Sequence, residues 1–194
     1  MPRLLICIER LSQISKAASL GAIRHEVAHT ILHGDPRYYI FTINKECQTL
    51  AQAKAIDMVA LKQILYYISV AVKDFEVATF LVHHNYIECQ AALALEQLKV
   101  TAEDKVAWLL AKSEPRTRAL YLAAQLKPLL FVHPLLAAAD NREQLTKSVS
   151  SMLEHMEQAE QDWLVQFANQ LAEQLKYDTH RNIGITLTSL LKQL

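Results

Sequence analysis

The sequence predicts a mainly α-helical protein, and three observations lead to this prediction. Glycine and proline are scarce, with 3 and 5 in 194 residues, so the chain has few places for tight turns. Alanine, leucine, glutamine, glutamate and lysine, which favour helices, are abundant. From residue 47 onward, apolar residues recur mostly three and four positions apart, which is the period of an amphipathic helix. We therefore expect few or no short strands, confined to the first 45 residues.

Two segments near the N-terminus are candidates for those strands. Residues 4–8 form a short, continuous apolar run of the kind that a buried strand shows, although the start of a helix has the same composition. Residues 37–43 are rich in aromatic and β-branched side chains, which suits a strand or an extended loop. Between them, residues 12–33 read as a helix that Ser12 or Ser15 would cap and that Gly34 would end.

The rest of the chain reads as a stack of amphipathic helices. Residues 47–83 are too long for an average helix, so we expect a break near Asp57. Thr101 and Asp104 have the spacing of a capping box, and Pro115 suits a first helical turn. Pro128 and Pro134 should interrupt the helix that Pro115 opens. The other helices are expected in residues 87–98, 141–156, 163–175 and 187–194.

Composition excludes several classes of function. Lysine plus arginine equals aspartate plus glutamate at 20 each, and no basic cluster indicates nucleic acid as a partner. The longest apolar stretch, residues 129–139, contains a histidine and a proline and is too short to span a membrane. Three cysteines without C-x-x-C spacing suggest neither disulfides nor a thiolate metal site. We therefore expect a cytoplasmic protein with no membrane partner.

The most informative motif is H-E-x-x-H, formed by His25, Glu26 and His29 within the helix of residues 12–33. Residues four apart on a helix point the same way one turn apart, so the two imidazoles can reach one zinc ion. Glu26 flanks them and could activate a water molecule. His33 lies a further turn along, and we interpret it as a supporting or cap residue.

A catalytic zinc usually has three protein ligands, so a third is needed. Asp35 is one candidate, but it follows the helix end and would need a sharp turn to come back. Glu76 is the best candidate, because it sits in an otherwise apolar helical stretch and a buried acid needs a partner such as a metal. Asp57, Asp74 and Glu88 are weaker alternatives.

These motifs resemble the gluzincin branch of the zincin metallopeptidases. The chain carries H-E-x-x-H-x-x-L-H from His25 to His33, followed by E-x-x-x-F from Glu76 to Phe80. The resemblance implies a compact zincin-like catalytic core within residues 1–85, with Zn²⁺ held by His25, His29 and Glu76. Residues 86–194 would then form a helical extension packed on that core or continuous with it.

We expect a zinc-dependent metallopeptidase that cleaves a peptide or protein substrate, with Glu26 taking the proton from the attacking water. The alternative is a non-catalytic, all-helical interaction module in which the H-E-x-x-H motif is fortuitous or binds structural zinc. The substrate, the oligomeric state and whether the chain is part of a longer protein stay open at this point.

Overall fold

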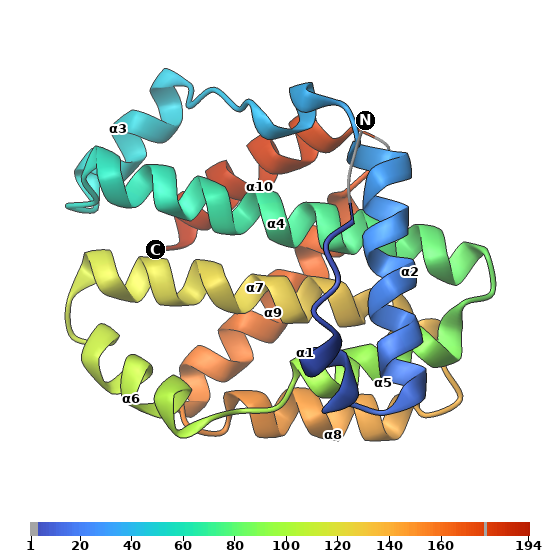
Figure 1. Ribbon diagram of the computed structural model, residues 1–194. Helices are drawn as coiled ribbons and strands as arrows, with labels where there is room; N and C mark the ends of the chain where they lie inside the picture. Colours follow the sequence, from blue (N-terminus) through green and yellow to red (C-terminus); the bar gives the residue numbers. More distant parts are fainter. Residues whose placement is uncertain (1–3, 177) are drawn as a thin grey trace.

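The computed structural model describes residues 4–176 and 178–194, and all regular structure in them is helical (Figure 1). The elements are α1 (Ile8–Ser12), α2 (Lys16–His33), the 3₁₀ helix η1 (Pro36–Tyr39), α3 (Lys45–Ala53), α4 (Met58–His83), α5 (Ile87–Gln97), α6 (Ala102–Ala111), α7 (Pro115–Ala138), α8 (Arg142–Leu153), α9 (Gln158–Gln174) and α10 (Thr179–Gln193). The mainly α-helical prediction is confirmed.

Neither candidate strand forms. Residues 4–7 are irregular and lead into α1, and both Leu5 before the helix and Ile8 at its start are largely exposed. Residues 37–43 divide between η1 and an irregular segment. Asp35 explains η1, because its side chain accepts a hydrogen bond from the Arg37 amide while Pro36 presets the first helical position. A strand also needs a neighbouring strand for its backbone groups, and none exists within the described residues.

Several helix boundaries lie where the sequence places them. Ser15 caps α2 by accepting a hydrogen bond from the Ala18 amide, and α2 ends at Gly34. The expected break occurs between α3 and α4, where Asp57 caps α4. Thr101 and Asp104 form the complete capping box that opens α6. These predictions are confirmed because capping depends on local hydrogen bonds that the sequence determines directly.

The interruption of α7 was predicted wrongly, because the helix continues through Pro128 and Pro134. A proline inside a helix costs about 3 kcal/mol or more. The apolar side chains around these prolines, among them Leu126, Leu130 and Phe131, are fully buried and stabilise the continuous helix. By length and composition α7 could cross a membrane, as could α3 and α4 taken as one bent span. In the most apolar stretch of α7, 56% of the residues are buried inside the molecule.

The long helices α4 and α7 lie side by side at the centre of the molecule (Figure 1). One apolar cluster joins residues of both halves of the chain, from Cys47 in α3 to Leu191 in α10. The helix α2 packs against α4 and, more extensively, against α5, while α10 packs on α4. Gly21 allows the close approach of α2 to α5, since a Cβ there would lie 2.2 Å from the Cys89 carbonyl oxygen. This packing fixes the position of the next turn of α2, which carries His25.

Candidate metal centre

Two histidines of α2 and one aspartate of α4 bring three ligand atoms together. The Nε2 atoms of His25 and His29 lie 3.1 Å apart, as expected from their spacing of one helical turn. Asp74 Oδ1 lies 3.1 Å from His29 Nε2 and 3.5 Å from His25 Nε2. The three residues form a buried group that could hold a metal ion.

The spacing of these atoms matches a tetrahedral ion. Ligands bound at about 2.0–2.1 Å to one tetrahedral zinc are separated by about 3.3–3.4 Å. The observed separations of 3.1, 3.1 and 3.5 Å bracket that value. Two imidazole nitrogens and one carboxylate oxygen are also a common donor set for divalent transition metals. The separations of these three atoms therefore fit such an ion.

Asp74 is held in its charged form. Burial alone would raise the pKa of its carboxyl group, but hydrogen bonds from His25 and His29 lower the pKa well below its usual range. The Lys127 ammonium of α7 lies 3.5 Å from Asp74 Oδ2 and acts in the same direction. One carboxylate oxygen thus faces the histidines while the other faces a partly exposed lysine.

His25 is enclosed more completely than His29. The His25 residue is only 5% exposed, and its ring meets the Phe131 ring edge-on, at 5.1 Å between centroids. Its Nδ1 atom is buried and has no hydrogen-bond partner among the described residues. His29 has a side chain that is 19% exposed, and its Nδ1 atom does have a partner. The two ligand candidates therefore differ in how firmly their ring orientation is fixed.

Glu76 does not lie with this pair. We expected its carboxylate at His25 and His29, and the structure places Asp74 there instead. Glu76 Oε2 accepts hydrogen bonds from His33 Nε2 at 2.9 Å and from the Thr179 hydroxyl at 2.7 Å. Positions 74 and 76 are about 200° apart around an α-helix, so the two acids leave α4 in different directions.

His33 connects the two groups. Its Nδ1 atom lies 3.2 Å from His29 Nδ1, and its Nε2 atom contacts Glu76. The His33 residue is only 1% exposed, so water does not compete for these contacts. The supporting position that the sequence suggests for His33 agrees with this geometry.

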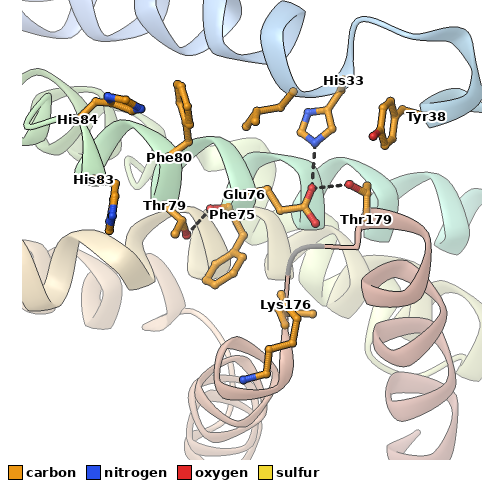
Figure 2. A pocket seen from close by; sticks show the side chains of 12 residues that line it. His33, Tyr38, Phe75, Glu76, Thr79, Phe80, His83, His84, Lys176 and Thr179 are labelled. Atoms are coloured by element: carbon orange, nitrogen blue, oxygen red, sulfur yellow. Dashed lines mark hydrogen bonds and ion pairs between the residues drawn. The ribbon is translucent and has the colours of Figure 1, made fainter.

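A pocket of about 480 Å³ opens beside His33 and Glu76 (Figure 2). Its walls are mostly apolar and include Leu32, Phe75 and Phe80, while Thr79 and Lys176 add polar groups. Figure 2 shows the hydrogen bonds from His33 and Thr179 meeting on the Glu76 carboxylate. The pocket reaches the supporting residue His33, whereas His25, His29 and Asp74 do not line it.

The other predicted site residues lie apart from the three ligand atoms. Asp35 caps η1 and pairs with the Arg37 side chain at 3.4 Å, so it does not turn back toward the histidines. Glu26 is exposed on α2, and its side chain makes no hydrogen bond or ion pair to any residue that the structure describes. Its carboxylate is therefore accessible to solvent, and its catalytic role stays a prediction.

Lys73, a buried lysine of α4, contacts two aromatic rings, one at the end of η1 and one just after it. Lys73 Nζ lies 4.1 Å from the centre of the Tyr39 ring and 5.9 Å from that of Phe41. Burial lowers the pKa of Lys73, while the carboxylates of Asp74 and Glu76 oppose this shift. Lys73 thus precedes Asp74 by one residue and Glu76 by three in the sequence, while its ammonium contacts aromatic faces.

Asp74, which we expected only as a weaker alternative, is the acid that lies beside His25 and His29. Its neighbours three and four positions away on the helix are Val70, Ala71, Val77 and Ala78, which are all apolar. At the corresponding positions Glu76 has two apolar residues, Val72 and Phe80, and two polar ones, Lys73 and Thr79. Neighbours at helical spacing therefore indicate Asp74 as the acid that faces the interior, and this signal was available.

We compared the chain with protein-family models, with curated proteins and with solved structures, and none of them matched.

Proposed function

We propose that this protein is a zinc-dependent hydrolase of peptide bonds, with the ion held by His25, His29 and Asp74. The observation that supports it most directly is the convergence of His25 Nε2, His29 Nε2 and Asp74 Oδ1 within 3.1–3.5 Å of one another. Three protein ligands leave a fourth position of a tetrahedral ion for water or substrate, as in catalytic zinc sites.

The chain supplies the base for this reaction through Glu26. When bound, zinc would lower the pKa of a coordinated water and polarise the substrate carbonyl. Glu26 follows His25 directly on α2, and its exposed carboxylate can accept the water proton and return it to the leaving amine. Lys127, 3.5 Å from Asp74 Oδ2 and partly exposed, adds a positive charge at the edge of the site.

Metal content and hydrolysis of labelled casein by purified variants test this proposal. We expect one zinc per chain in the native protein and in Glu26→Gln, and less than one tenth of that in His25→Ala. Glu26→Gln should lower hydrolysis by about 10²–10⁴-fold, the usual contribution of a general base. The exposed acid Glu154, mutated to Gln, is the matched control and should change neither quantity.

The same donor set of two histidines and one carboxylate also binds Fe(II), so the metal analysis must quantify iron as well as zinc. Iron in place of zinc, or no metal at all, would overturn the proposal. If hydrolysis survives in Glu26→Gln, the proposed metal site still stands, but Glu26 is not the base.

A structural metal site in a non-catalytic helical module is the second candidate. One observation favours it: His25 and Asp74 are only 5% and 4% exposed, which limits the approach of a substrate. In that case the ion would fasten α2 to α4, and chelation would lower the melting temperature of a protein that has no hydrolytic activity. The casein assay separates the two candidates, because only the first predicts zinc-dependent cleavage.

A further inference from the structure

We propose that the pocket beside His33 and Glu76 binds a small amine, with the apolar body of the ligand against the walls and its ammonium group on the Glu76 carboxylate. This pocket is separate from the candidate metal centre, because His25, His29 and Asp74 do not line it. The proposal therefore goes beyond the hydrolase proposed above and requires no metal.

The pocket has the size and the walls of a small-molecule site. Its volume of about 480 Å³ lies within the range of about 300–1,000 Å³ that such sites occupy. It runs along α4 from Glu76 to His83, seven residues that cover about 10 Å at the helical rise (Figure 2). Leu32, Phe75 and Phe80 contribute apolar walls. A ligand that fills this space therefore needs an apolar body.

Glu76 is the charged group of the pocket that the fold holds in place. Asn182 Nδ2 donates to its Oε1 atom at 2.7 Å, while Oε2 accepts from the Thr179 hydroxyl at 2.7 Å and contacts His33 Nε2 at 2.9 Å. A carboxylate has about four acceptor positions, so one on Oε1 is left free by these contacts. Because the side chain is 14% exposed and lines the pocket, a ligand can reach it.

An ammonium group supplies what this carboxylate lacks. No lysine or arginine of the described residues forms an ion pair with Glu76, and the ammonium of Lys73 lies against the Tyr39 ring instead. A ligand ammonium brings a positive charge and an N–H donor to the free position on Oε1. The Thr179 hydroxyl, which also lines the pocket, donates its proton to Glu76 and can accept a second N–H.

The basic side chains of the pocket are less suited to hold an acid. Lys176, His83 and His84 are exposed, and their side chains make no hydrogen bond or ion pair to the residues that the structure describes. Figure 2 shows the Lys176 side chain running away from Glu76, with both histidines toward the opposite end of the pocket. An acidic ligand would have to order these side chains and would meet the like charge of Glu76. The geometry thus favours an amine.

Three indole derivatives of similar shape test this preference: tryptamine carries an ammonium group, tryptophol a hydroxyl and indole-3-propionate a carboxylate. Each is titrated into the metal-free protein, in the presence of a chelator, and followed by ¹H–¹⁵N NMR. We expect tryptamine to bind about tenfold more tightly than tryptophol, because charged hydrogen bonds are roughly twice as strong as neutral ones. Indole-3-propionate should bind more weakly than either. The amides of Thr79, Phe80 and Thr179, around the pocket, should shift during the titration.

Glu76→Gln keeps the shape of the side chain and removes its charge. Tryptamine should then lose its advantage of about tenfold, while tryptophol stays within about twofold of its native affinity. Glu88→Gln, the same change at an exposed position of α5 outside this pocket, should keep the native preference.

Circular dichroism and thermal melting identify any variant that fails to fold. Thr79→Trp, at an exposed position of the pocket wall, then provides a second variant. Its larger side chain should fill the pocket and abolish the binding of tryptamine and tryptophol alike.

The outcomes decide the inference independently of the proposed function. Tryptamine that does not bind, or that shifts only amides away from the pocket, overturns it. Tighter binding of indole-3-propionate would assign the pocket to acids and overturns it too, as does a preference for tryptamine that survives in a folded Glu76→Gln protein. Because all these measurements use the metal-free protein, a native protein that binds no zinc overturns only the hydrolase proposed above.

Discussion

The helix α4 makes two contacts of opposite character. Toward α7 it belongs to an apolar core in which Ile64, Ile68 and Leu126 are fully buried. Toward α2 it presents Asp74 and Glu76 to three histidines, through side-chain hydrogen bonds of 2.9–3.1 Å. Burial of apolar surface stabilises the first contact, while burial of polar groups costs free energy unless each finds a partner. The comparison indicates that the α4–α7 contact contributes most to the stability of the fold, whereas the α2–α4 contact holds the group that could bind a metal ion.

The largest effect should come from the apolar contact. Leu130 of α7 is fully buried, and its replacement in Leu130→Ala should lower the free energy of unfolding by about 2–5 kcal/mol in urea denaturation. Leu110→Ala, at an exposed position of α6, should change it by about 0.5 kcal/mol or less. The Leu130→Ala protein that remains folded should still bind one zinc. A loss below about 1 kcal/mol would contradict the assignment of stability to α4–α7.

Added metal should stabilise the polar contact further. At a free zinc concentration of 100 times Kd, the native protein should gain about 2.7 kcal/mol. For a domain of this size, differential scanning calorimetry should show a rise in Tm of about 5–10 °C. Asp74→Ala should abolish this response and Asp162→Ala, at an exposed position of α9, should retain it. A response that survives in Asp74→Ala would place the ion elsewhere.

Lowering the pH should weaken the polar contact between α2 and α4, because it protonates Asp74. The pKa of Asp74 is lowered in the folded protein, whereas in the unfolded chain it has its ordinary value of about 4. As the pH falls below that value, the unfolded chain therefore binds more protons than the folded one. The stability that Asp74 contributes is therefore present above that pH and is lost as the pH falls further. In urea denaturation of the metal-free protein, Asp74→Asn should show a shallower decline in acid than the native protein. Equal slopes in the two proteins would contradict the sign.

The smallest effect should follow from Lys127. Its ammonium lies 3.5 Å from Asp74 Oδ2 but its side chain is 44% exposed, so solvent screening limits its influence to about 1 kcal/mol or less. Because a positive charge opposes the binding of a cation, Lys127→Met should bind zinc up to about fivefold more tightly. Lys105→Met, exposed on α6, should leave the affinity unchanged. Weaker binding in Lys127→Met would mean that the lysine serves chiefly to orient Asp74.

The local parts of the structure were predictable because their causes are local. The caps of Ser15, Asp57 and Thr101 need only hydrogen bonds within one helical turn. The shared direction of His25 and His29 follows from helical geometry alone. The expected strands and the expected break at Pro128 failed because each depended on what lies beside the segment: no strand to pair with in the first case, and a close-packed apolar core in the second.

By itself the sequence determined a helical protein with two imidazoles on one face of one helix. The apolar neighbours of Asp74 at helical spacing favour it as the acid that faces the interior, but the sequence did not determine that this acid meets the two histidines. The tertiary structure decided this by setting the angle at which α2 crosses α4 and by bringing α10, some hundred residues later, against Glu76. The physical reason is that a helix fixes the direction of each side chain, while packing between helices fixes which other side chains it meets.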